Sequence, residues 1–321
     1  MHASISEIFA HLPQSGHLIT SRIATLKEVP PSGRHALHIR GIPFPYVSVQ
    51  SWLPPDEQYL ELSNPPADSP LRHSPNADYR QAMAKAVEAG FKLFTFWLPW
   101  RMVEPTQECW QTDRLQQILN QAAEFGLHLE IVWGGSNFCG QIYPRFAPDW
   151  LMEDNSFHLR GPDGLVLRGP DWDMGCCPLP DVSNTTLLQR EQSALKRLMN
   201  HLAEHDTEHR VVFIQLLNEV DLPGLDVAAQ PGFRFPPASW TKGQKEAVLN
   251  YCNELGRAIK ESSHPLPTRM NLSVHSPDHD PLVGSLPFID CHGLDIYSED
   301  VNFVRRVCQQ RDASAFPHIA E

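Results

Sequence analysis

The feature that most constrains this chain is a regular alternation of short apolar runs with longer stretches of helical periodicity. Each apolar run is short enough for a buried strand rather than a buried helix. The predicted strands are residues 46–50, 91–97, 127–133, 211–217, 269–274, 289–296 and 316–320. The predicted helices are residues 79–89, 113–125, 187–204, 244–262 and 301–311. Strands that alternate with helices pair in parallel through right-handed crossovers, so the sequence predicts an α/β fold.

Two architectures share this alternation, a (β/α)8 TIM barrel and an open, doubly wound sheet. No Gly-rich phosphate-binding turn accompanies the predicted strands, and polar and aromatic residues gather just after the strand ends, where barrel active sites lie. A length of 321 residues also suits a TIM barrel, which typically needs ~250 residues. We therefore expect the barrel.

The predicted barrel is incomplete, because the seventh strand is the last and the eighth is missing. A barrel with seven strands leaves two unpaired parallel edges. Either the sequence is a fragment, or another chain or an unusual seven-stranded arrangement closes the gap. A homo-oligomer is compatible with such open edges.

Charge and composition exclude several partners. The chain has 26 basic and 38 acidic side chains and a net charge of −12, which argues against binding nucleic acid. No run approaches the ~18 apolar residues of a membrane span, and no secretory signal is recognisable at the start, so we expect no membrane partner and a cytoplasmic location. The seven cysteines form no CxxC pair, which is typical of reduced intracellular thiols.

Two predicted strands run directly into a glutamate. The run 211–217 continues into Asn218 and Glu219, and the run 316–320 continues into Glu321. If the fourth and seventh strands face each other across a barrel, these two carboxyl groups converge at the carboxyl-terminal mouth. Taken alone, an Asn-Glu pair after a strand commonly caps the following helix or meets solvent.

Two carboxyl groups in one pocket are what glycosidic cleavage requires. One carboxyl is protonated and donates to the leaving oxygen, while the other is ionised and attacks the anomeric carbon. Repulsion from ionised Glu321 would keep Glu219 protonated near neutral pH. A separation of ~5–5.5 Å predicts retention of configuration, and ~6.5–9.5 Å predicts inversion. Asn218 can hydrogen-bond the sugar 2-hydroxyl.

Aromatic residues near the strand ends are candidates for sugar binding. Trp97, Trp100 and Trp133 follow the second and third strands, and indole faces stack on the C–H surfaces of pyranose rings. Tyr297 ends the sixth strand and can orient the nucleophile by a hydrogen bond. Singly, each tryptophan is more often a packing residue, and a tyrosine at a barrel rim often has its hydroxyl in water.

Further polar residues follow the same strands. Glu104 can grip sugar hydroxyls or pair with Arg101, and Asn137 can bind sugar or serve only as a turn residue. His275, Asp278 and His279 form the only tight cluster of metal-ligand types. Their spacing would need a helix, but prolines in this segment favour a loop. We therefore expect neither a metal nor a cofactor.

Several blocks together resemble clan A glycoside hydrolases, most closely the family 35 and family 42 β-galactosidases. Glu104-Pro105 resembles the end of the strand-two segment, and Glu219 lies in a block similar to the strand-four motif with the acid/base. The resembling blocks are residues 40–49, 94–105, 125–150, 212–220, 289–297 and 316–321. Residues 171–180 match no part of the family pattern, and the accessory β-domains usual in the family are absent.

The resemblance implies a retaining exo-β-glycosidase, β-galactosidase-like, that hydrolyses terminal β-galactosides by double displacement. It implies that Glu219 is the acid/base, Asn218 its companion, Tyr297 the hydrogen-bond partner of the nucleophile and Glu321 the nucleophile. We expect residues 1–35 to be an N-terminal extension and residues 36–321 a catalytic barrel domain acting on carbohydrate. Two alternatives remain open: a non-catalytic or truncated sugar-binding relative, and an interaction protein whose two carboxyl groups point apart.

Overall fold

The computed structural model describes residues 23–29, 34–51, 79–136, 146–161, 163–171, 175–218, 242–273, 286–295, 300–303 and 318–320. Four predicted site residues, Glu219, Glu321, Tyr297 and Asn137, lie outside the described residues. The histidine cluster considered for metal binding, at residues 275–279, also lies outside them.

One parallel sheet of seven strands forms the centre of the molecule, and its strands follow one another in chain order. The strands are β4 (Ser48–Ser51), β5 (Leu93–Pro99), β6 (His128–Gly134), β9 (Val211–Leu216), β10 (Thr268–Ser273), β11 (Cys291–Asp295) and β12 (His318–Ala320). Each overlaps one of the predicted apolar runs. A doubly wound sheet would reverse its strand order at a switch point, whereas this order proceeds in one direction.

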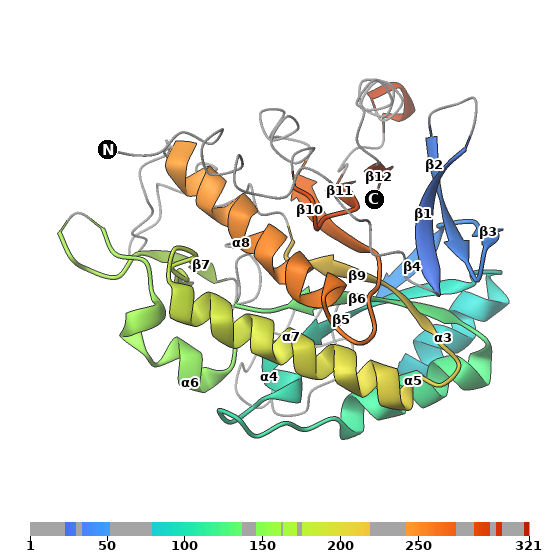
Figure 1. Ribbon diagram of the computed structural model, residues 1–321, viewed down its shortest axis with the longest axis horizontal. Coiled ribbons are helices and arrows are strands. Elements are labelled where there is room, and N and C mark those ends of the chain that lie inside the picture. The colour runs from blue at the N-terminus through green and yellow to red at the C-terminus, as the bar shows by residue number, and fades with distance from the viewer. Residues whose placement is uncertain are drawn as a thin grey trace.

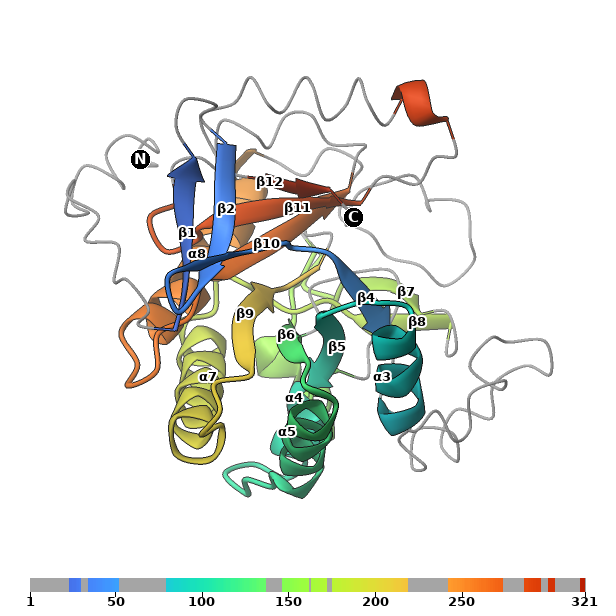
Figure 2. The same cartoon turned by 90° about the vertical axis from the view of Figure 1, so that its right-hand side faces the viewer.

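The sheet curls into an arc, with helices on its outer side (Figure 2). Among the described residues no pairing joins β4 to β12, so the arc is an incomplete (β/α) barrel. The long helices are α3 (Tyr79–Glu88), α5 (Asp113–Phe125), α7 (Thr185–His205) and α8 (Lys242–Lys260). They confirm four predicted helices to within two residues at each end. Residues 301–303 of the fifth are also helical.

Local sequence explains where these helices begin and end. The Asn184 side chain accepts hydrogen bonds from the backbone N–H groups of Thr186 and Leu187, which satisfies two orphan donors at the start of α7. Gly126 ends α5 in the left-handed conformation, with φ of 66°. Two short helices, α4 (Trp100–Val103) and α6 (Asp149–Met152), follow β5 and the loop after β6.

Side chains alternate between the two faces of the arc, as strand geometry requires. On β5, the residues Phe94, Phe96 and Leu98 face outward into the main hydrophobic core beneath the helices. Leu93 and Trp97 lie on the inner face and belong to two smaller clusters. The outer face therefore supports the helices, while the inner face is left to form a site.

An antiparallel hairpin with a third short strand, which was not predicted from the sequence, packs on the inner-face cluster that contains Leu93 and Phe213. It consists of β1 (Ala24–Val29), β2 (Arg34–Ile39) and β3 (Ile42–Phe44). Leu37 and Ile39 pack in one cluster with Leu93 and Phe213, near the beginnings of β5 and β9. The hairpin therefore covers the amino-terminal end of the arc. The predicted division at residues 35 and 36 stays a prediction, although β2 runs across it.

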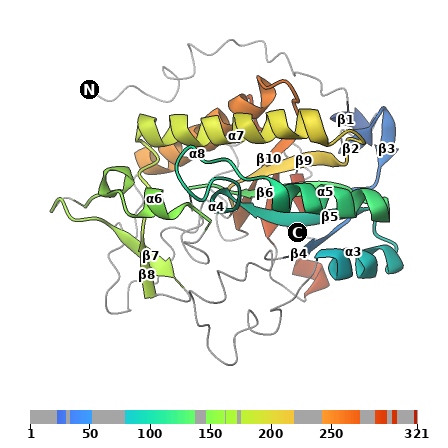
Figure 3. The same cartoon turned by 90° about the horizontal axis from the view of Figure 1, so that it is seen from below.

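A second hairpin lies at the opposite end of the molecule. It comprises β7 (Arg168–Asp171) and β8 (Gly175–Pro178), close to α6 (Figures 1 and 3). The segment 171–180, which matched no part of the family pattern, contributes one strand of it. None of the helices among the described residues is both long and apolar enough to cross a bilayer.

Candidate active site

Asn218 lies just beyond the carboxyl-terminal end of β9. Of the predicted pair Asn218 and Glu219, it is the residue that the structure describes. Leu217, just before it, has a left-handed backbone with φ of 58°, a conformation that costs a non-glycine residue ~1–2 kcal/mol. Nε2 of Gln215 donates to the backbone oxygen of Leu217 at 3.1 Å and to Oδ1 of Asn218 at 2.8 Å. Gln215 thus holds both the unusual turn and the amide beyond it.

A second strand also orients the Asn218 amide. Nδ2 of Asn271, in β10, donates to Oδ1 of Asn218 at 2.9 Å. Because both donors meet the oxygen, Nδ2 of Asn218 points away from Gln215 and Asn271. A terminal amide oriented in this way presents an N–H donor in a defined direction, as recognition of a hydroxyl requires.

The inner face beside this amide carries Trp97, Val132 and Phe146, which form one small cluster. The rings of Trp97 and Phe146 stack with 4.9 Å between centroids and 7° between planes. Val132 of β6 pairs with Trp97 of β5 on one side and with Gln215 of β9 on the other. In the described part of the chain, Nε1 of Trp97 and Oε1 of Gln215 are buried without a hydrogen-bond partner. This layer therefore contains one donor and one acceptor that no described group satisfies.

Trp100 and Trp133, in contrast, are fully buried in the main core, with exposed fractions of 0%. The ring centroid of Trp100 lies 6.3 Å from that of Trp133 and 5.6 Å from that of Trp150. Their predicted role as a sugar platform stays a prediction. In this structure both indoles pack against other aromatic rings.

Glu104 serves as an anchor for the segment that follows β5. It is 6% exposed; its carboxylate accepts from Nε1 of Trp100 and from the backbone N–H of Glu108, both at 2.8 Å. Among the described residues it forms an ion pair with Arg197 of α7 at 3.6 Å, a contact from a distant helix that was not predicted from the sequence. Its proposed contact with sugar remains a prediction.

Glu191 of α7 lies beneath the end of β6 and is also completely buried. Oε1 accepts from Nε1 of Trp133 at 2.9 Å, and Oε2 accepts from the backbone N–H of Ser136 at 3.2 Å and the hydroxyl of Tyr251 at 2.5 Å. Burial raises the pKa of Glu191, and these three hydrogen bonds oppose that shift. Sequence analysis missed this residue because an acid on a helix face usually lies in solvent.

A buried ion pair crosses the inner face nearer the amino-terminal end. Nε of Arg269, in β10, lies 2.5 Å from Oε1 of Glu130, in β6. Oε2 of Glu130 accepts from the hydroxyl of Thr95 at 2.9 Å and from that of Tyr46. The only signal in the sequence was a charged residue inside each of two strand-like runs. This network is distinct from the rim at the ends of the strands.

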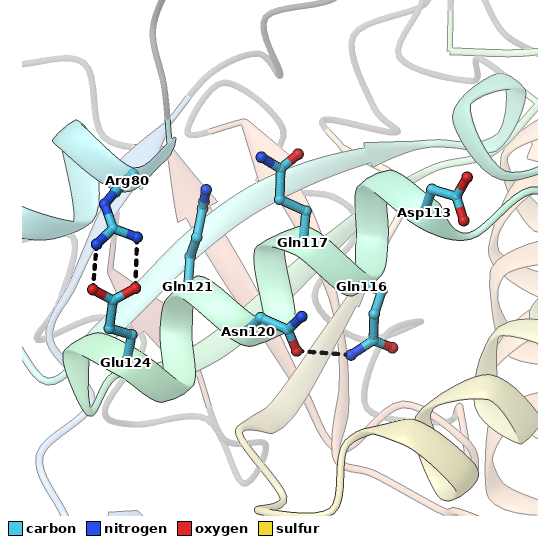
Figure 4. A pocket seen from close by; sticks show the side chains of 7 residues that line it. All are labelled: Arg80, Asp113, Gln116, Gln117, Asn120, Gln121 and Glu124. Atoms are coloured by element: carbon cyan, nitrogen blue, oxygen red, sulfur yellow. Dashed lines mark hydrogen bonds and ion pairs between the residues drawn. The ribbon is translucent and has the colours of Figure 1, made fainter.

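Two hollows on the described surface lie away from the carboxyl-terminal strand ends. One, of about 440 Å³, is formed by the outer faces of α3 and α5, where Arg80 and Glu124 form an ion pair (Figure 4). The other, of about 520 Å³, lies under the turn between β2 and β3. Among the described residues, no group of three or more potential metal ligands is assembled.

Comparison with known proteins defines the fold. No protein-family model matches the sequence, and no curated protein matches it either. The structure is similar to an exo-β-1,4-mannosidase from Opitutaceae bacterium strain TAV5, with a TM-score of 0.53, 16% identity, and coverage of 84% of this chain and 41% of that chain. It is also similar to the β-galactosidase of the psychrophilic Marinomonas ef1, with a TM-score of 0.50, 13% identity and coverage of 78% and 40%.

A third similar structure is the β-galactosidase of Bacillus circulans sp. alkalophilus, with a TM-score of 0.50, 15% identity, and coverage of 72% of this chain and 39% of that chain. The chain thus spans about two fifths of the length of these enzymes. The predicted resemblance to clan A glycoside hydrolases is confirmed in the fold, an incomplete barrel of the kind these glycosidases contain.

Proposed function

We propose that this chain forms the catalytic barrel of a retaining exo-β-glycosidase that acts on terminal β-galactosides. The observation that carries the proposal is the Asn218 amide, held by Gln215 and Asn271 at the carboxyl-terminal end of β9. Glu219 is the next residue along the chain and is proposed as the acid/base. The left-handed Leu217 supports this assignment, because backbone strain is concentrated at functional sites.

The pairing of β12 supports Glu321 as the nucleophile. Ile319 pairs with Gly293, which pairs in turn with Asn271. Since side chains alternate along a strand, the position two residues after Ile319 is expected on the face that carries Asn271. Position 321 is therefore expected at the carboxyl-terminal rim, on the inner side of the arc, where Glu219 is also proposed to lie.

The proposed mechanism is a double displacement. Glu321 attacks the anomeric carbon while Glu219 donates a proton to the leaving oxygen, and Glu219 then removes a proton from the water that hydrolyses the glycosyl ester. Nδ2 of Asn218 donates to the sugar 2-hydroxyl, a contact that strengthens as positive charge develops on the ring. Tyr297 and Asn137 are proposed to orient the nucleophile and the sugar, respectively.

Covalent labelling tests the two carboxyl roles. We expect a 2-deoxy-2-fluoro-β-galactoside to inactivate the chain and to label the peptide that contains Glu321, as detected by mass spectrometry. We expect Glu219→Ala to lower kcat/KM for an aryl β-galactoside by ~10²–10⁴-fold, with recovery of turnover in azide. The control is Glu204→Ala, which removes an exposed acid of α7 and should leave turnover unchanged.

The outcomes separate the alternatives. Labelling at another residue, or full activity of Glu219→Ala, would contradict the assignment. Sugar binding by calorimetry without any turnover would indicate the non-catalytic relative. Faster hydrolysis of an aryl β-mannoside than of the galactoside would keep the mechanism but reject the substrate, a useful comparison because both specificities occur among the similar structures.

A further inference from the structure

We propose that Glu191 is a positioning residue, whose buried carboxyl group holds the turn after β6 and so directs the segment that leads to Asn137. The inference rests on the proposed function, since Asn137 is there a sugar contact. It assigns a task to a buried ionisable group that the proposed reaction does not use.

The hydrogen bonds of Glu191 join three parts of the fold. Glu191 belongs to α7. Its donors are the indole of Trp133 in β6, the backbone N–H of Ser136 after β6, and the hydroxyl of Tyr251 in α8. Ser136 and Tyr251 also contact each other, with 3.4 Å between their hydroxyl oxygens. One carboxyl group therefore ties the end of a barrel strand to two outer helices.

The turn lies directly against this carboxyl group. A Cβ atom added to Gly135 would lie 1.7 Å from Oε1 of Glu191 and 2.5 Å from Nε1 of Trp133. The backbone therefore approaches as closely as glycine permits, and no other residue type fits without displacing Glu191. Such close approach fixes the direction in which the chain leaves β6.

The cost of burying this acid supports a specific role. None of the described lysines or arginines forms an ion pair with Glu191, and a buried carboxylate without a cation is expensive unless donors surround it. An apolar side chain on α7 would pack against β6 at lower cost. The three donors offset the cost, and two of them belong to the end of β6 and its turn.

Tyr251→Phe is the sharpest test, because it removes one donor and little volume. We expect the Ser136 amide to exchange its hydrogen at least about 10-fold faster, since loss of a hydrogen bond to a charged group is worth roughly a factor of ten. We expect KM for the aryl β-galactoside to rise on the order of 10-fold with a smaller change in kcat, because a misplaced sugar contact weakens binding. Both measurements use the full chain.

Tyr79→Phe is the matched control. Tyr79 is equally buried, but in the described part of the chain its hydroxyl has no hydrogen-bond partner. Its removal should leave KM and Ser136 exchange unchanged. Glu191→Gln should exceed Tyr251→Phe in both effects, because an amide turns an N–H toward either Trp133 or Ser136, and a donor cannot satisfy a donor.

Two results would overturn the proposal. One is a Tyr251→Phe protein that matches Tyr79→Phe in both exchange and KM. The other is a Glu191→Gln protein with lowered thermal stability but unchanged KM, as a merely structural acid would give. If the wild-type chain hydrolyses no glycoside, the proposed function fails, and hydrogen exchange at Ser136 still decides whether Glu191 holds the turn.

Discussion

Two buried tryptophans of this protein each donate an indole N–H to a carboxylate, Trp100 to Glu104 and Trp133 to Glu191. A buried indole usually has an acceptor for its N–H group, and a carboxylate is the strongest that a side chain can supply. Glu104 caps the short helix α4 that begins with Trp100, whereas Glu191 joins the end of β6 to α7. The residues nearest the proposed sugar site are therefore held by buried polar contacts.

Gly135→Ala should be strongly destabilising for this reason. The new methyl group would lie 1.7 Å from Oε1 of Glu191, so the carboxyl group must move away from its donors, each worth ~1–3 kcal/mol when left buried and unsatisfied. We expect the free energy of unfolding to fall by ~2–4 kcal/mol, measured by urea denaturation. Ser136→Ala keeps the backbone N–H and should cost about 1 kcal/mol or less; equal losses for the two would contradict this account.

At this scale, sequence alone identified residue types better than their orientation. Asn218 was recognised because it directly follows a strand. The roles of Gln215 and Asn271 were not, since they depend on which strands are neighbours and in what register. Trp100 and Trp133 were recognised as strand-end indoles. The face of Trp133 follows from the alternation of β6, whereas the side on which Trp100 lies, after β5 has ended, is decided by tertiary contacts.

Among the elements, α8 approaches its surroundings closely at one glycine. Gly256 lies near the carboxyl-terminal end of this helix, and a Cβ atom there would be 2.4 Å from the backbone oxygen of Phe288. A backbone oxygen cannot rotate away as a side chain can. The glycine therefore lets α8 pack against the segment that precedes β11, despite its low helix propensity.

Gly256→Ala should accordingly destabilise the protein, although alanine favours an isolated helix by ~1 kcal/mol. We expect a loss of ~1–3 kcal/mol, typical of overpacking in a well-packed interior. Asn250→Ala, at an exposed position of the same helix, is the control and should be neutral or slightly stabilising. A stabilised Gly256→Ala protein in thermal unfolding would rule out the close packing.

Elements with strong periodicity were predicted accurately, and weaker ones were missed. The helix at residues 113–125 was predicted with its observed bounds, because Gly126 ends it and its apolar residues recur on one face. The hairpin β1–β2 was missed, because its alternation is interrupted by polar residues such as Glu28 on a short strand. Its pairing is stabilised mainly by tertiary burial of Ala24, Leu37 and Ile39.

For the molecule as a whole, buried histidines link stability to pH. Burial lowers the pKa of His128, His201 and His264 from the ordinary value of 6.5. Below pH 6.5 these three side chains therefore bind more protons in the unfolded chain than in the folded chain. The corresponding stability is present above that pH and is lost as the pH falls below it.

His264→Asn should remove part of this dependence. The difference in unfolding free energy between wild type and variant should be constant above about pH 7 and should shift in favour of the variant as the pH falls below about 6.5. Urea denaturation across this range measures it. A pH-independent difference for His264→Asn would refute the linkage.

The order of the strands in the whole molecule followed from the alternation of strands and helices, because consecutive parallel strands with one-way crossovers leave few topologies. The curl of the sheet did not follow from it. Glu130 and Arg269 meet across the intervening strand β9, a contact between distant residues that no local pattern in the sequence reports.

That ion pair also makes misaligned strands costly while the protein folds. A slip of one residue between β9 and β10 would turn Arg269 to the opposite face of the sheet. Glu130 would then be enclosed without its cation, at a cost of ~3–5 kcal/mol, a large share of the ~5–15 kcal/mol that stabilises an ordinary domain. Chains with a shifted register would therefore separate and pair again. The buried ion pair thus selects the strand register that places the proposed catalytic residues at the carboxyl-terminal ends of the strands.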